Sequence, residues 1–86
     1  MINKEYMVQR YGDEELLFAD GFDEAIIGVS LGATNRVVYD AQVMADTLVK
    51  NGDADYPDAW EYLEFNTFQS YVGDRTPIYV NIERIE

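Results

Sequence analysis

Ala25-Ile-Ile-Gly-Val-Ser-Leu31 and Arg36-Val-Val-Tyr39 are two mainly apolar runs separated by a short polar connection, Gly32-Ala-Thr-Asn35. β-branched and aromatic residues, which favour strands, dominate both runs. Glycine and asparagine in the connection accept the positive φ angles that tight turns need. The stretch therefore predicts a β-hairpin, around which the rest of the fold is organised.

Side chains alternate between the two faces of a strand, which divides the residues of each predicted strand into two sets. In the first strand, the alternation assigns one face to Ile27, Val29 and Leu31. A last strand is predicted after Pro77, and its inner face is assigned to Ile78, Val80 and Ile82.

Two helices are predicted between the hairpin and the last strand. Asp40 is expected to cap a helix over 41–50, because its carboxylate can accept from the free amides of the first turn. A second helix is expected over 58–72, with Gly73 as its C-terminal cap. Its apolar residues form two stripes: Tyr62, Phe65, Phe68 and Val72 on one side, and Trp60, Leu63, Thr67 and Tyr71 on the other.

The predicted fold class is α+β, with one domain over residues 1–86. We expect a largely antiparallel sheet of three to four strands with both helices packed on one face. The order is strand–strand–helix–helix–strand, and a weak strand over 5–11 would be the additional one.

Charge and composition exclude several classes of function. The 86 residues include 17 carboxylates, six basic side chains, no histidine and no cysteine, for a net charge of -11. This charge repels nucleic acid and anionic membranes and favours basic partners. The commonest general base, the commonest metal ligand and the best nucleophile are missing. No apolar run is long enough for a signal peptide or a membrane span, so we expect a soluble cytoplasmic protein without a cofactor.

Four segments resemble a family of small acidic proteins encoded by bacteriophages and mobile elements. They are Phe22-Asp-Glu-Ala-Ile-Ile-Gly-Val29, Val37-Val-Tyr-Asp40, Glu61-Tyr-Leu-Glu-Phe-Asn-Thr-Phe68 and Tyr71-Val-Gly-Asp-Arg-Thr-Pro-Ile78. The resemblance covers about residues 18–80, is densest over 59–79 and does not extend to the first seventeen residues. It implies an early phage accessory protein made in the host bacterial cytoplasm, and no particular chemistry.

The carboxylates that could bind a partner fall into two groups. The first consists of Asp13, Glu14, Glu15, Asp20, Asp23 and Glu24. The second consists of Asp53, Asp55, Asp58, Glu61 and Glu64. Gathered on one face, they would form a phosphate-like array that competes for a groove lined by lysine and arginine. Spread over the surface, they would only keep the protein soluble.

A calcium loop is the second candidate site. Asp53, Asp55 and Glu64 match positions 1, 3 and 12 of an EF-hand loop. Pro57 and Asp58 occupy positions 5 and 6, and position 6 requires glycine for its sharp turn. We therefore expect a helix start here, while a looser carboxylate site for calcium or magnesium stays open.

The second helix also offers aromatic anchors for a partner. If the sheet covers the stripe that contains Phe65, Trp60 and Tyr71 are free to contact a partner or a second copy. The alternative is that the first helix and the N-terminal segment bury them. Asn66, an unfavourable residue in mid-helix, is expected to make a structural hydrogen bond to the backbone of 75–77.

No nucleophile elbow, P-loop or dinucleotide fingerprint is present, which favours a non-catalytic protein. The leading hypothesis is a phage-type protein that occludes, and so inhibits, a basic nucleic-acid-binding host or defence protein, in the manner of an anti-CRISPR inhibitor. The alternatives are a small homo-oligomeric phage structural or assembly protein with incidental acidity, and a binder of divalent metal or a small ligand. A homodimer stays open in either case.

Overall fold

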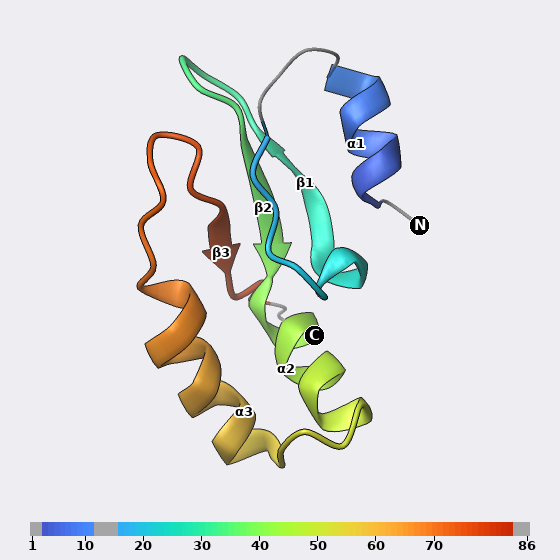
Figure 1. Cartoon of the computed structure of the whole chain (residues 1–86), viewed down its shortest axis with the longest axis vertical. Coiled ribbons are helices and arrows are strands. Elements are labelled where there is room, and N and C mark those ends of the chain that lie inside the picture. Colours follow the sequence, from blue (N-terminus) through green and yellow to red (C-terminus); the bar gives the residue numbers. More distant parts are fainter. Residues whose placement is uncertain (1–2, 12–15, 84–86) are drawn as a thin grey trace.

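The structure, a computed structural model, describes residues 3–11 and 16–83 and is α+β, as predicted (Figure 1). Its elements are α1 (Lys4–Tyr11), the short 3₁₀ turn η1 (Asp23–Ala25), β1 (Ile26–Ser30), β2 (Arg36–Asp40), α2 (Ala41–Lys50), α3 (Tyr56–Leu63), the π-helical turn η2 (Glu64–Phe68) and β3 (Ile78–Val80). The strand predicted over 5–11 is wrong, because this segment forms α1 and buries Met7 in the core.

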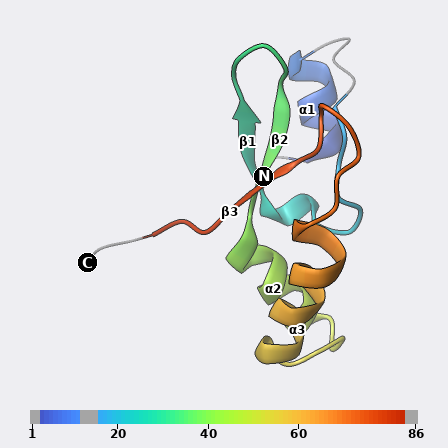
Figure 2. The same ribbon diagram turned by 90° about the vertical axis from the view of Figure 1, so that its left-hand side faces the viewer.

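The helices α2 and α3 form an antiparallel pair that extends beyond the end of β2 (Figures 1 and 2). They therefore do not cover one face of the sheet in the way we expected.

The chain passes directly from β2 into α2, where Asp40 Oδ1 accepts from the amides of Gln42 at 2.9 Å and Val43 at 3.3 Å. This confirms the predicted cap. At the other end, Gly52 adopts φ 79° and the Asp53 amide donates to the Leu48 carbonyl, which closes α2.

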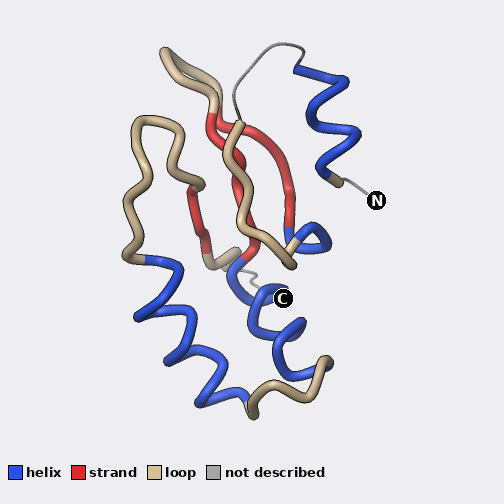
Figure 3. Tube along the Cα trace, in the orientation of Figure 1, coloured by secondary structure: helices blue, strands red, loops and turns tan. Residues whose placement is uncertain are grey.

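β2 is the central strand of a mixed sheet (Figure 3). It pairs with β1 in the predicted antiparallel hairpin and with β3 in parallel. The expectation of a largely antiparallel sheet is therefore wrong for β3. A parallel pair needs a long crossover connection, and α2, α3 and η2 provide it.

A β-bulge in β1 changes which of its side chains point inward. The pairing register shifts between Ile26 and Gly28, so Ile27 is the extra residue. Because a shift of one residue reverses the alternation, Ile26 and Val29 both pack on the core. Ile27 and Leu31 are exposed whereas Val29 packs on the core, so these three residues do not share one face as predicted.

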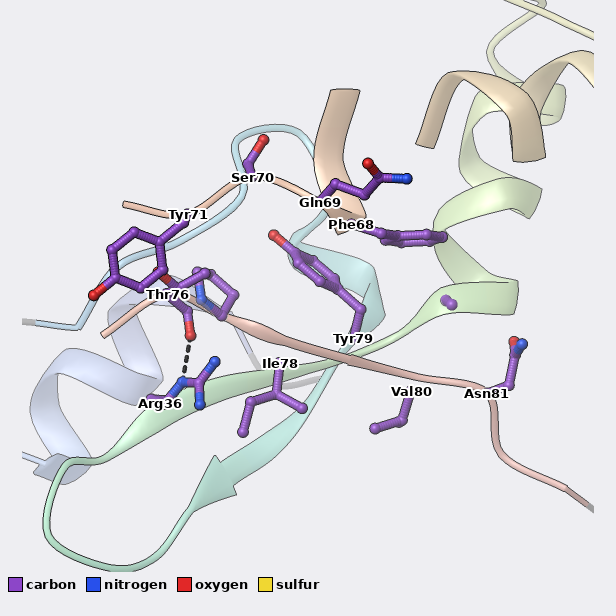
Figure 4. A pocket seen from close by; sticks show the side chains of 12 residues that line it. Arg36, Phe68, Gln69, Ser70, Tyr71, Thr76, Ile78, Tyr79, Val80 and Asn81 are labelled. Carbon is purple, nitrogen blue, oxygen red and sulfur yellow. Dashed lines mark hydrogen bonds between the residues drawn. The ribbon is translucent and has the colours of Figure 1, made fainter. Parts of the chain in front are cut away.

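The side chains of β3 point the opposite way from the prediction. Tyr79 faces the core, where its ring stacks on Tyr39 at 5.7 Å and meets Phe68 at 5.2 Å between centroids. Ile78 and Val80 point to the other side of the strand (Figure 4). An aromatic ring buries more apolar area than an aliphatic side chain, which favours this orientation.

The N-terminal segment covers the inner face of the sheet. Residues 16–19 have no regular structure and cross in front of β2 (Figure 1), where the Ala19 amide donates to the Tyr39 hydroxyl at 2.7 Å. The fully buried side chains with the largest volumes are Tyr39, Met7, Met44, Leu63 and Val37. The core thus joins α1, the hairpin, α2 and α3.

The second helix ends earlier than predicted. It begins at Tyr56, and its regular hydrogen bonding gives way to the π-helical turn η2, which ends at Phe68. Asn66 Nδ2 donates to the Tyr62 carbonyl at 3.0 Å, so its expected bond to the backbone of 75–77 is not formed.

A loop over 69–77 follows in place of the last predicted helical turn. It is held by buried Thr76, whose hydroxyl donates to the Gly73 carbonyl at 2.6 Å and accepts from the Val72 amide at 2.9 Å. Gly73 therefore turns this loop, at φ 113°, rather than capping a helix.

Candidate functional site

The exposed side of α3 and η2 combines carboxylates with aromatic rings. Its residues are Asp58, Glu61, Tyr62, Glu64 and Phe65, which we call the acidic–aromatic face. Four of them follow the spacing i, i+3, i+4 and i+7, which places them along one side of a helix. On the opposite side, Ala59 and Leu63 are fully buried.

The aromatic anchors of this face differ from those predicted. Tyr62 is 51% exposed and Phe65 is 71% exposed. Trp60 is half-buried and packs against Phe68 at 6.2 Å between ring centroids, which agrees with the alternative in which it belongs to the core. Tyr71 is exposed, but it lies in the 69–77 loop and not on the helix.

A small residue, Ala59, explains why the side of the helix that contains Leu63 faces the core and why Phe65 is exposed. Ala59 and Leu63 are spaced i, i+4, and α2 contributes Ala45 to the same core cluster. Short side chains let two helices approach closely, and α3 turns Ala59 and Leu63 toward the core while Phe65 is exposed. Treating Ala59 as a core residue would have predicted Phe65 to be exposed.

The carboxylates of this face have no basic side chain near them in the sequence. Residues 51–74 contain six carboxylates and no lysine or arginine. Asp53, Asp55, Asp58, Glu61 and Glu64 are all exposed, and the ion pair between Lys4 and Asp20 found in the described part of the chain involves none of them. Two of these carboxylates are stabilised by the start of α3. Asp55 Oδ1 caps the helix by accepting from the Asp58 amide at 3.0 Å. Asp58 lies in the first turn, where the helix dipole favours an anion.

A hollow of about 460 Å³ borders the acidic–aromatic face. Its lining combines two carboxylates, one aromatic ring and two apolar side chains: Asp53, Asp58, Tyr62, Leu48 and Ala54. This is the chemistry that a lysine or arginine side chain requires. The apolar residues can pack on its aliphatic stem, while carboxylates and a ring face can hold its charge.

One hydrogen bond fixes the start of α3 against α2. The Tyr56 hydroxyl donates to Asp46 Oδ1 at 2.9 Å, and Gln42 Nε2 donates to the same oxygen at 3.0 Å. The hydrogen bond to Asp46 raises the pKa of Tyr56. The second acidic group is therefore presented on an anchored element.

The first acidic group is placed differently. Asp20 forms an ion pair with Lys4 Nζ at 2.9 Å, and this hydrogen bond raises the pKa of Lys4. Asp23 and Glu24 line a separate hollow of about 350 Å³, together with Lys4 and Lys50. Neighbouring ammonium groups thus partly neutralise this group. Asp13, Glu14 and Glu15 lie outside the described residues.

The calcium-loop pattern does not assemble into a metal site. Asp55 is engaged as the cap of α3, and Glu64 lies beyond the end of that helix. Within residues 3–11 and 16–83, no group of three or more carboxylates is arranged to hold a metal ion.

Among the described residues, no helix has the length and apolar character that crossing a membrane requires. Comparisons with protein-family models, with curated proteins and with solved structures gave no match. The chemistry of the surface itself therefore carries the functional assignment.

Proposed function

We propose that this protein binds a basic, nucleic-acid-binding protein through the acidic–aromatic face and blocks its nucleic-acid groove. The observation that carries the proposal is the stretch of six carboxylates without a basic residue over 51–74, three of which lie on α3 and η2. The sequence resemblance implies a bacteriophage setting, so we propose that the partner is a host or defence protein. The proposed role is non-catalytic.

The charge of the face supplies attraction and speed. A basic groove that normally holds phosphates releases condensed anions when carboxylates replace them, so binding depends strongly on salt. Complementary potentials also raise the association rate well above that of neutral surfaces. Both properties suit an inhibitor that must compete with nucleic acid.

The aromatic residues and the hollow supply the short-range contacts. Tyr62 and Phe65 are exposed among the carboxylates, and aromatic anchors commonly dominate binding energy at protein interfaces. We expect a partner arginine or lysine to enter the hollow between Asp53 and Asp58, beside the Tyr62 ring. Such a contact would add specificity that charge alone lacks.

Affinity capture from the heparin-binding fraction of a bacterial lysate tests this function. We expect the immobilised protein to retain a defined basic protein, and duplex DNA or increased salt to displace it. The Glu61→Gln/Glu64→Gln variant should lose retention, because it removes two charges from the acidic–aromatic face.

The matched control is Glu5→Gln/Glu24→Gln, which removes two exposed carboxylates from α1 and η1 by the same chemistry. It should keep the captured protein. Equal loss in both variants would show that only the net charge matters and would contradict a specific face. The proposal would also be contradicted if the natural protein and both variants all failed to retain a basic protein.

A further inference from the structure

β3 leaves one edge of the sheet unpaired among the described residues. The strand order is β1-β2-β3, so the edge of β3 away from β2 has no neighbouring strand. A groove of about 680 Å³ runs along β3, with Phe68 and Tyr71 on one side and Ile78 and Val80 on the other (Figure 4). An open strand edge beside such a groove is the arrangement that accepts an added strand.

The residues after β3 form an arm with the sequence pattern of a strand. Ile78, Val80 and Ile82 alternate with polar or aromatic residues, yet only 78–80 pair with β2. The pairing stops because β2 ends at Asp40, where the chain turns into α2. Residues 81–83 are exposed and project from the body (Figure 2).

The charge of the groove favours a second copy of this chain. Two molecules of net charge -11 repel each other, so they can approach only through a surface with few carboxylates. The described lining of the groove has no carboxylate, and Arg36 is its charged residue. Arg36 is held at the start of the groove, where its Nε donates to the Thr76 carbonyl (Figure 4).

The geometry points to an antiparallel pairing of the β3 strands and arms of two copies, with Val80 near the two-fold axis. In this arrangement Ile82 of one copy lies opposite Ile78 of the other. The alternating aliphatic side chains of both copies then share one face of a continuous six-stranded sheet. The pairing is isologous, so each copy gives its arm and receives the other.

Single-cysteine cross-linking tests this pairing, because the natural chain has no cysteine. Opposed residues at the axis of an antiparallel pair lie about 4.5–5.5 Å apart between Cα atoms, within disulfide reach. Val80→Cys should therefore form a covalent dimer on oxidation, whereas Glu61→Cys on α3 should not.

Sedimentation of variants at Ile82 provides the second measurement. Ile82→Glu should weaken the dimer about tenfold or more, because it places a charge opposite Ile78 of the other copy, and Ile82→Val should retain the dimer. A monomer at every concentration, a dimer that does not cross-link through Val80→Cys, or a dimer indifferent to Ile82→Glu would overturn the inference. The outcome is independent of the proposed function, because neither substitution alters the acidic–aromatic face.

Discussion

Tyr39 connects the hairpin to the segment that covers it. Its side chain is fully buried, its ring stacks on Tyr79, and its hydroxyl accepts the Ala19 amide at 2.7 Å. Burial of the phenol raises its pKa to about 12, although the hydrogen bond from Ala19 acts in the opposite direction. One residue thus sets both the packing of the sheet and its response to alkali.

Stability should fall as pH rises from 10 to 12. The unfolded phenol loses its proton near pH 10, whereas folded Tyr39 retains it until about pH 12. The folded state therefore binds more protons in this window, and up to about 2–3 kcal/mol of unfolding free energy is lost across it. Urea unfolding at pH 9 and pH 11.5 measures this loss.

Tyr39→Phe provides the control for this pH response. At pH 7 it should cost about 1–3 kcal/mol, because the Ala19 amide loses its acceptor. Its stability should then depend less on alkaline pH than that of the natural protein. An unchanged alkaline slope in Tyr39→Phe would contradict the role given to this phenol.

Residue-level prediction succeeded where the signal was local. Asp40 was identified as a cap because its carboxylate and the amides it accepts are neighbours in sequence. The residues that share a face in β1 were assigned wrongly because the bulge at Ile27 depends on pairing with β2, which strict alternation does not take into account. The orientation of Tyr79 likewise depends on Tyr39 and Phe68, which are distant in the chain.

At the scale of elements, the cap of α2 is the most direct test of the junction between sheet and helices. Asp40→Ala should cost about 0.5–2 kcal/mol, because two amides lose their acceptor in a buried position. Asp40→Asn should retain most of the stability. Chemical denaturation measures both variants.

Asp55→Ala is the comparison for this prediction, because Asp55 caps α3 through a single exposed bond to the Asp58 amide. Its effect should be the smaller of the two. A larger effect from Asp55→Ala than from Asp40→Ala would contradict the importance assigned to the junction of β2 and α2.

The elements themselves were predictable to different degrees. The bounds of α2 agree with the sequence signals, because the cap, the apolar face and the stop at Asn51-Gly52 are all local. The direction of β3 was not predictable, because it depends on where the crossover returns the chain. The acidic group over 53–64 was predicted, but its partner rings Tyr62 and Phe65 were not, because the contact of Ala59 with the core decides which stripe is free.

At the scale of the whole molecule, the charge destabilises the folded state. Compaction brings 17 carboxylates together, and six of them lie in a stretch with no cation. Salt screens this repulsion. Raising sodium chloride should therefore raise the melting temperature, by about 4–8 °C for each ~1 kcal/mol gained in a domain of this size.

The variants that test the partner surface also test this effect. Glu61→Gln/Glu64→Gln should respond less to salt than Glu5→Gln/Glu24→Gln, because the first pair belongs to the uncompensated stretch. Thermal unfolding followed by circular dichroism at low and moderate salt measures the difference. Equal salt responses would show that the repulsion is spread evenly over the molecule.

The measurement that tests the central claim most directly is displacement of DNA from the captured basic protein. Fluorescent duplex DNA is bound to that protein, and anisotropy is followed as our protein is added. We predict release of the DNA by the natural protein and by Glu5→Gln/Glu24→Gln, and little release by Glu61→Gln/Glu64→Gln. DNA that stays bound while our protein joins the complex would contradict occlusion by the acidic–aromatic face.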